Sequence, residues 1–375
     1  MIRFVCPLLI VLMLVFSMPA KAQIPQDSSS AVIFVYQRVG EDQLPAANLG
    51  IDLFEEHLRE LTAGNYNVMS IPDIIAKIRD GLELPAKTVG LSFDGAYKST
   101  LENAVPLLEK YKFPFTIFVS TDTADQATPQ DMSWNDLRRL QKRKYISLGV
   151  MPAAYAHMTT LSAKENEALM NKAVTRFREE LGASPTLFAW PYGEFSTALK
   201  NIADKYSFAA AFGQQSGVVY SGSDFLALPR FLMTDDYGDI DRFRMTASAN
   251  PLPVSDLVPT DTVLDANPPK IGFTVGPEVK NLSGLSCFAS GAGKIPLEIL
   301  GDNRVELRLN DPLIEERTRI NCTLPVKDAG TGETLHWRWL GMLFVAPMET
   351  HEHSGAGENE NTAPPAPDTA GSQTE

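Results

Sequence analysis

Asp94 is the residue of this sequence whose type and position are best suited to chemistry. It follows the apolar run Thr88–Phe93, which reads as a buried strand, and it is followed by Gly95 and Ala96. An aspartate at the carboxyl end of a strand in a parallel barrel points into the mouth, where such folds place their active sites. Aspartate is also a common helix N-cap, so Asp94 could instead cap the segment that follows it. Both interpretations stay open on this stretch alone.

A second candidate segment, Phe188–Gly193, ends another apolar run with the turn Trp190-Pro191-Tyr192-Gly193. Flat aromatic faces are suited to sugar rings, and a few polar donors fix a ligand's orientation. Aromatic side chains that could serve in this way are Tyr97, Trp134, Trp190 and Tyr192. Arg230 could donate hydrogen bonds beside them, whereas Trp190 could equally be core packing.

Four segments together resemble the polysaccharide deacetylase (NodB-homology) family. They are Ser92-Phe93-Asp94-Gly95-Ala96-Tyr97, Pro191-Tyr192-Gly193, Val35-Tyr36-Gln37-Arg38-Val39 and Leu228-Pro229-Arg230. The resemblance covers about residues 31 to 245 and implies a distorted (β/α)7 barrel. It also implies a hydrolase that removes acetyl groups from N-acetylated sugars with a divalent metal such as zinc, which polarises the acetyl carbonyl and holds the attacking water.

The positions that hold the metal in this family carry other residues here. By the resemblance, Asp94 stands at the position of the catalytic base, and the metal-binding aspartate falls at Gly95. The two metal-binding histidines fall at Met151 and Tyr155, and an earlier family histidine at Gln37. A thioether and a phenol are poor substitutes for imidazole on zinc. The sequence therefore predicts no metal cofactor, with Asp94 acting as a base only if the protein is active, and Tyr97, Pro191, Tyr192 and Arg230 binding substrate.

Other histidines offer little to replace the missing ligands. His157 could enter the site if its loop shifted, while His57 is expected on a helix surface. His336 belongs to the second domain, and His351 and His353 to the tail. One histidine and one carboxylate would still be a weak site, because zinc usually takes three or more protein ligands.

The elements that must position Asp94 alternate between apolar runs and amphipathic segments, which predicts an α/β domain over residues 23–250. The runs are Ala31–Tyr36, Thr88–Phe93, Phe115–Val119, Tyr145–Val150, Leu187–Trp190 and Phe208–Phe212. The expected helices are Asp52–Ala63, Leu101–Lys110, Trp134–Arg143, Ser162–Leu181 and Ser196–Tyr206. Ser162 and Glu165 form a capping box, and Gly182 is suited to close that helix.

A second domain follows a proline-rich segment, residues 251–269, that is expected to be a linker. Short alternating runs over 270–347 predict a β-sandwich-like domain. Cys287 and Cys322 form an even pair with no zinc-ligand spacing, which favours a disulfide in an oxidising compartment. Trp337 and Trp339 share one strand face. Such a face belongs to the core of a sandwich more often than to an exposed carbohydrate-binding platform, so we expect core packing. The tail, 348–375, lacks aromatic residues and is expected to be disordered.

Residues 1–22 have the pattern of a secretory signal peptide, with Arg3, an apolar run over 5–16 and the small-x-small site Ala20-Lys21-Ala22. We therefore expect an exported protein, periplasmic or secreted, with no membrane span after cleavage. The formal charge of −13 argues against nucleic acid or an anionic membrane surface as a partner, because both need a basic patch.

Three functions remain open on the sequence. The first is recognition of an N-acetylated polysaccharide without hydrolysis, which the missing ligands favour. The second is an active N-deacetylase with an atypical site. The third is a non-catalytic module that binds a protein partner through the β-domain.

Overall fold

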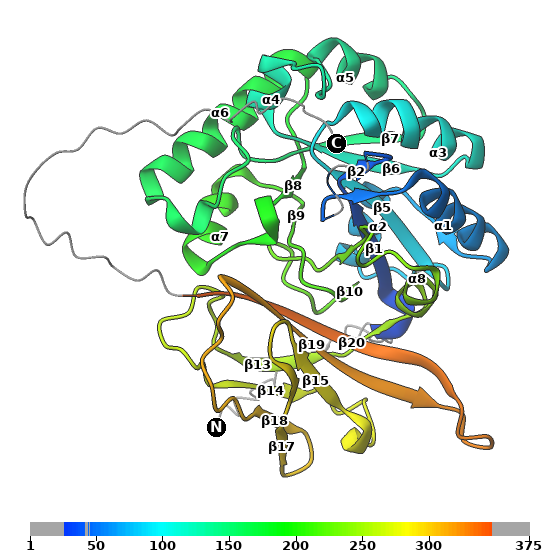
Figure 1. Cartoon of the computed structure of the whole chain (residues 1–375), viewed down its shortest axis with the longest axis vertical. Helices are drawn as coiled ribbons and strands as arrows, with labels where there is room; N and C mark the ends of the chain where they lie inside the picture. The colour runs from blue at the N-terminus through cyan, green and yellow to red at the C-terminus, as the bar shows by residue number, and fades with distance from the viewer. Residues whose placement is uncertain (1–25, 42–43, 45, 347–375) are drawn as a thin grey trace, which may run out of the picture.

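The computed structural model describes residues 26–41, 44 and 46–346 (Figure 1). The signal peptide and the tail expected from the sequence lie outside the described residues. The first domain is built on one curled sheet whose strands run in the spatial order β10-β1-β5-β6-β7-β8-β9. Their bounds are β10 Val218–Tyr220, β1 Ser30–Tyr36, β5 Thr88–Asp94, β6 Phe115–Val119, β7 Ile146–Val150, β8 Leu187–Ala189 and β9 Ala210–Phe212. The pairs along this path are parallel except β1 with β10, which confirms the predicted distorted barrel.

Short strands extend this sheet, and helices cover it. β4 (Asn67–Val68) pairs with β5, and β11 (Phe231–Leu232) with β1. A separate pair is formed by β2 (Arg38–Val39) and β3 (Asn48–Leu49). The helices are α1 Ile51–Ala63, α2 Ile71–Arg79, α3 Val105–Tyr111, α4 Thr121–Gln126, α5 Trp134–Gln141, α6 Ala163–Leu181, α7 Thr197–Ala203 and α8 Ile240–Ala247. The predicted caps of α6 are confirmed, with both capping-box hydrogen bonds present and Gly182 left-handed at φ 74°.

The strands bury both faces, because alternate residues belong to two different apolar clusters. Phe34 and Phe188 lie in the cluster under the helices. Ile33 and Phe212 lie in the inner cluster, which also takes four isoleucines of α2: Ile71, Ile74, Ile75 and Ile78. Gly90, near the amino end of β5, makes room for this helix, since a Cβ there would lie 3.0 Å from the Ile71 side chain. Helix α2 thus fills the barrel at the end opposite Asp94, and we call the carboxyl end of the strands, at Asp94, the mouth.

The second domain consists of two sheets with a common apolar core, as predicted. One sheet has the order β12-β20-β19-β15-β16 and the other β13-β14-β18-β17. Their bounds are β12 Asn250–Pro251, β13 Val254–Val258, β14 Ile271–Val275, β15 Ser286–Ala289, β16 Gly293–Ile295, β17 Leu297–Leu300, β18 Arg304–Leu307, β19 Arg317–Lys327 and β20 Thr334–Val345. Phe273 of one sheet and Ile320 of the other belong to the same buried cluster.

Two details of this domain differ from or extend the sequence analysis. The linker expected over 251–269 was wrong in part, because β13 lies within it and pairs with β14 as a strand of the second sheet. The disulfide between Cys287 and Cys322 is confirmed, and it joins residues that face each other across β15 and β19.

Strand β20 packs directly on the barrel (Figure 1). The Trp339 ring lies 5.2 Å from Phe231 of β11 and belongs to the barrel's apolar cluster, so its face is not the sandwich core that was expected. Gly341 allows the close approach, because a Cβ there would lie 1.8 Å from the Ser216 carbonyl oxygen. The β-domain is therefore packed against the barrel beside β11.

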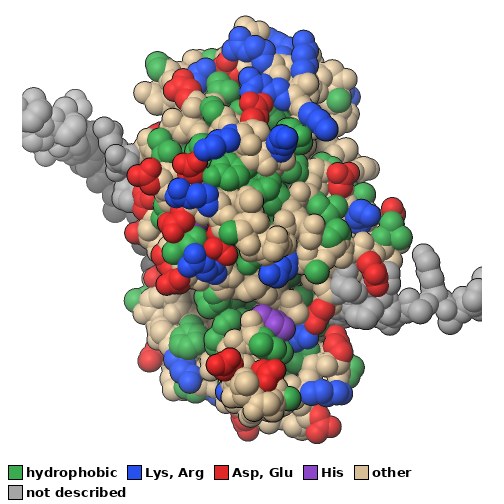
Figure 2. Space-filling model, turned by 90° about the vertical axis from the view of Figure 1, so that its right-hand side faces the viewer, with side chains coloured by type: hydrophobic (Ala, Val, Ile, Leu, Met, Phe, Trp, Pro, Cys, Tyr) green, Lys and Arg blue, Asp and Glu red, His purple; other side chains and the backbone are tan. Residues whose placement is uncertain are grey.

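The surface carries charges of both signs. On the face that Figure 2 shows, acidic and basic side chains alternate with small hydrophobic areas, and Lys and Arg gather at the upper end. Within the described part of the chain, no helix has the length and apolar character needed to cross a membrane.

Candidate functional site

The carboxylate of Asp94 lies at the mouth in a buried ion pair with Arg230. The two Nη atoms of Arg230 donate to the two carboxylate oxygens, each at 2.7 Å. Gln214 Nε2 adds a third hydrogen bond of 3.1 Å to Oδ2. Both charged side chains have 0% exposure. Asp94 is thus held by side chains from other segments and does not act as a helix cap.

Arg230 is fixed on all sides. Its Nε donates to the Gly213 carbonyl at 2.9 Å and its Nη1 to Ser92 Oγ at 3.2 Å. The guanidinium carbon lies 5.4 Å and 5.6 Å from the ring centroids of Phe118 and Phe212. The expectation that Arg230 donates to a sugar was wrong for this structure, because its donors are directed to Asp94 and to its own surroundings.

The position of the family's metal-binding aspartate has no room for a side chain. Gly95 has φ +91°, which L side chains rarely adopt, and a Cβ there would lie 2.3 Å from the Tyr97 ring. Tyr97 therefore occupies the space that a carboxylate at this position would need.

Met151 and Tyr155, where the resemblance places the family's histidines, have other contacts. Met151 is fully buried in the inner apolar cluster. The Tyr155 hydroxyl accepts hydrogen bonds from Gln37 Nε2 at 3.3 Å and from the Tyr192 amide at 3.4 Å. Burial raises the pKa of Tyr155, so its phenol stays protonated at neutral pH.

These residues do not fit a divalent metal. Zinc needs deprotonated nitrogen, sulfur or oxygen ligands, whereas the positions here carry a glycine, a buried thioether and a protonated phenol. Across residues 26–41, 44 and 46–346, no three histidine, cysteine or acidic side chains come together as a ligand set.

Tyrosines lie around the buried ion pair at the mouth. Tyr155 and Tyr192 meet edge to face at 4.6 Å, and the guanidinium of Arg38 lies 3.7 Å over the Tyr97 ring. Tyr192 has φ +57°, an uncommon conformation for a residue other than glycine. Pro191 was expected to bind substrate. It is buried, however, so it shapes this turn and offers no face to a ligand.

The two histidines of the first domain have structural partners. His157 stacks on the Tyr192 ring at 3.9 Å, and its Nδ1 lies 2.9 Å from the carboxylate of Glu194. The expectation that His57 lies on a helix surface was wrong, because its side chain is buried. Its Nε2 donates to the Gly238 carbonyl at 2.6 Å. Burial lowers the pKa of His57 to about 4, so its imidazole is neutral at pH 7.

The comparison with known families agrees with this architecture. Residues 81–211 match the family model described as polysaccharide deacetylase. This segment contains the Asp94 strand, Met151, Tyr155 and the Pro191-Tyr192-Gly193 turn. Over residues 81–211, the barrel is a polysaccharide deacetylase domain by this match.

Curated relatives of the deacetylase domain include the poly-beta-1,6-N-acetyl-D-glucosamine N-deacetylase of Staphylococcus aureus (strain MRSA252). It is 21% identical over 54% of this chain and 73% of its own length. The Escherichia coli (strain K12) protein of the same name is 22% identical over 48% of this chain and 33% of its own length.

Solved structures show the same fold. The Streptococcus pyogenes deacetylase PplD has a TM-score of 0.53 at 18% identity, covering 58% of this chain and 98% of PplD. IcaB from Ammonifex degensii has a TM-score of 0.53 at 20% identity, covering 58% of this chain and 97% of IcaB.

The β-domain contributes a residue to the mouth of the deacetylase domain. Arg317 of β19 donates from Nη1 to the Tyr192 carbonyl at 3.2 Å, and its Nε lies 3.3 Å from Glu194. Glu194 is almost fully buried and thus links His157 and Arg317 on either side of Tyr192. Sequence reasoning missed this contact, because Arg317 lies 125 residues from Tyr192 in an ordinary alternating strand.

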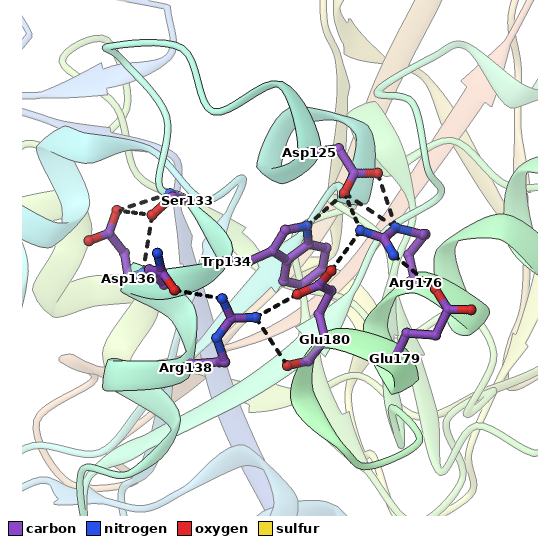
Figure 3. Close-up of polar contacts among 9 residues, drawn as sticks. Asp125, Ser133, Trp134, Asp136, Arg138, Arg176, Glu179 and Glu180 are labelled. Atoms are coloured by element: carbon purple, nitrogen blue, oxygen red, sulfur yellow. Dashed lines mark hydrogen bonds and ion pairs between the residues drawn. The ribbon is translucent and has the colours of Figure 1, made fainter.

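The tryptophans considered for sugar stacking serve the deacetylase core instead. Trp134 packs among α4, α5 and α6, and its indole nitrogen donates to Asp125 at 2.7 Å (Figure 3). Arg176 of α6 also donates to Asp125 at 2.7 Å (Figure 3). Trp190 is fully buried, and its indole nitrogen donates to the Leu226 carbonyl.

Proposed function

We propose that this protein binds an extracytoplasmic N-acetylated polysaccharide at the mouth of its deacetylase domain and leaves the acetyl groups in place. The observation that carries this proposal is the buried pair of Asp94 and Arg230 beneath metal positions that hold Gly95, Met151 and Tyr155. The predicted signal peptide supports an extracytoplasmic setting.

Hydrolysis of an acetamide needs a base for the attacking water and a positive group for the developing oxyanion. Both oxygens of Asp94 accept hydrogen bonds from Arg230, and the carboxylate is closed to solvent. Arg230 is equally closed, so it cannot reach a tetrahedral oxyanion. Without a metal site, neither requirement is met.

Binding of a sugar makes smaller demands, which the mouth meets. Tyr97, Tyr155 and Tyr192 lie around the mouth; Arg38 packs on the Tyr97 ring and His157 on the Tyr192 ring, so these tyrosines offer ring edges and hydroxyl groups to a sugar. The left-handed backbone of Tyr192 is maintained by contacts from His157 and Arg317, and strain of this kind is concentrated at functional sites. The relatives' name, poly-beta-1,6-N-acetyl-D-glucosamine N-deacetylase, supports an N-acetylhexosamine polymer as the ligand class.

Calorimetry with a β-1,6-linked N-acetylglucosamine oligosaccharide tests the proposal. We expect Tyr192→Ala to weaken binding by about 1–1.5 kcal/mol, roughly tenfold, through loss of an aromatic contact. Tyr145→Ala is the matched control, because Tyr145 directly precedes β7 at the end away from the mouth. Thermal melts of both variants exclude unfolding as the cause.

Absence of binding by the unmodified protein would refute the proposal. Equal affinity of Tyr192→Ala and the unmodified protein would place the ligand elsewhere on the chain. If the unmodified protein binds no oligosaccharide but retains a protein partner through its β-domain, the alternative of a non-catalytic module that binds a protein is favoured.

A further inference from the structure

A cavity of about 370 Å³ lies where the β-domain meets the barrel, and we call it the junction cavity. Its rim is polar: Thr260 is exposed there, and Lys200 Nζ forms an ion pair of 2.7 Å with Asp224. Mostly apolar walls with a few polar groups, in a cavity between two domains, are typical of a site for a small ligand. The apolar walls come from both domains and include Phe195, Val218, Leu252, Trp339 and Leu343.

One edge of strand β20 is unpaired along the junction cavity. In an antiparallel pair of strands, alternate residues direct their N–H and C=O groups away from the partner strand. On β20, Trp339 is such a residue, because its carbonyl accepts from the Leu252 amide on the side away from β19. Gly341 and Leu343 follow at steps of two and therefore point the same way. Within the described residues, the backbone N–H and C=O groups of these two residues have no hydrogen-bond partner on that side.

This gap in the sheet has a cause in the sequence. Pro253, which follows Leu252, has no N–H with which to continue along β20. The chain leaves the edge there, joins the other sheet as β13, and returns to β20 at Thr262, whose carbonyl accepts from the Val345 amide. Buried backbone groups are nearly always paired in folded proteins. Leu343 is buried, so a ligand in the junction cavity could supply the partners that its N–H and C=O lack.

Gly341 is less accessible to a ligand than Leu343. The backbone of Ser216 in the barrel lies against Gly341, since a Cβ on this glycine would be 1.8 Å from the Ser216 carbonyl oxygen. A further polar atom without a partner is Gln215 Oε1, which is buried in a residue of the cavity wall. The junction cavity thus combines an unpaired donor and acceptor on Leu343 with an unpaired acceptor on Gln215.

The length of the gap limits what can fill it. Leu252 and Thr262 close it at either end, because each bonds to β20. The residues to which they bond, Trp339 and Val345, are six positions apart, which is about 20 Å along a strand. A long peptide could not lie along this edge without displacing one of the two closing segments. A compact ligand with a carbonyl and a hydroxyl group needs no such displacement.

We propose that the junction cavity binds one N-acetylated sugar residue, whose acetamido carbonyl accepts from the Leu343 amide. This inference rests on the proposed function and adds a second contact for the same polysaccharide. A neighbouring ring hydroxyl would donate to the Leu343 carbonyl. The acetamido N–H lies on the opposite side of its planar amide, which leaves it for Gln215 Oε1. The methyl group and the apolar face of the ring would lie against the walls, and other hydroxyls would face Lys200 and Asp224.

The junction cavity and the mouth share one loop of the barrel. Gln214 donates to Asp94 at the mouth, and Gln215, the next residue, lines the junction cavity. A polymer of N-acetylated residues has an acetamido group for each of the two sites.

Amide hydrogen exchange, measured by NMR on the full processed chain, tests this inference. The β-1,6-linked N-acetylglucosamine oligosaccharide should slow exchange of the Leu343 amide roughly tenfold at saturation, as one hydrogen bond predicts. The Leu340 amide is the internal control and should change little, because Leu340 is paired with Cys322 of β19 in the free protein. The N-deacetylated oligosaccharide should leave the Leu343 amide unprotected, since it lacks the accepting carbonyl.

A matched pair of variants assigns the effect to the junction cavity. Thr260→Trp places a large side chain at its rim and should abolish the protection of Leu343. Thr334→Trp makes the same change at an exposed position of β20 outside the cavity and should keep the protection. Thermal melts show that both variants are folded. Protection that persists in Thr260→Trp would overturn the inference.

The remaining outcomes separate this inference from the proposed function. Oligosaccharide binding in calorimetry with unchanged exchange of the Leu343 amide would overturn the inference alone. Protection by an N-acetylated tripeptide amide, but not by the oligosaccharide, would assign the gap to a peptide and overturn it too. Absence of any oligosaccharide binding would overturn the proposed function as well.

Discussion

Arg230 and Asp94 form a two-point ion pair, with both nitrogen–oxygen distances at 2.7 Å and no solvent exposure of either side chain. Such a pair is stable only while both partners are present, because each charge alone would be buried without compensation. In this chain the carboxylate at the family's base position is therefore part of the barrel's internal structure.

Removing one partner of this pair should be costly. We expect Asp94→Ala to lower the free energy of unfolding by about 3–5 kcal/mol, since it leaves the Arg230 charge buried and unpaired. The double variant Asp94→Leu/Arg230→Met should lose clearly less. Urea unfolding of the three proteins measures both values. A single variant no less stable than the double one would show that the pair is not buried in solution.

Gly95 should tolerate no side chain. In Gly95→Ala, a residue with a side chain must adopt a left-handed backbone conformation, and its Cβ meets the Tyr97 ring. We expect the free energy of unfolding to fall by about 1–3 kcal/mol from backbone strain, and further because of the clash. Gly81→Ala is the control, because Gly81 has φ +66° with nothing within 4 Å of the added Cβ. Equal losses at the two positions in chemical denaturation would mean that Tyr97 does not occupy this space.

His57 should make stability depend on pH. Its folded pKa of about 4 lies below the ordinary value of 6.5, so the unfolded state binds more protons between these values. Stability should therefore be lost as the pH falls from 6.5 towards 4, by up to about 3 kcal/mol. His57→Gln should remove this part of the pH profile in denaturant titrations. Parallel profiles for the two proteins would contradict a buried neutral imidazole.

The disulfide should stabilise the β-domain. Cys287 and Cys322 are 35 residues apart, for which the loop-entropy relation gives about 3–4 kcal/mol. We expect the double variant Cys287→Ala/Cys322→Ala to unfold at lower denaturant concentration by that amount. Thiol titration of the unfolded, unreduced chain without its leader should find no free thiol. Two titratable thiols would disprove the bridge.

Local sequence patterns predicted the features that short segments determine. The buried strand Phe115–Val119 and the capped helix Ala163–Leu181 lie where the pattern placed them, because hydrophobic periodicity and capping residues act within a few turns. The family motifs likewise identified Asp94 and the positions around it.

Contacts between distant segments were not predictable in this way. His57 lies on a helix whose neighbours suggest a surface position, but Phe243 of α8 stacks on its ring at 4.0 Å. Arg317 reaches Tyr192 only because the β-domain packs on the barrel. The partner of Asp94, Arg230, follows it by 136 residues, and no periodicity in either segment signals the pair.

Acetate release tests the central claim most directly. The processed protein is incubated with the β-1,6-linked N-acetylglucosamine oligosaccharide, in parallel with added zinc and with a chelator, and binding is measured in the same samples. The account predicts binding without acetate above the spontaneous rate in either sample. Sustained release that scales with protein concentration and disappears in a folded Asp94→Asn variant would contradict it.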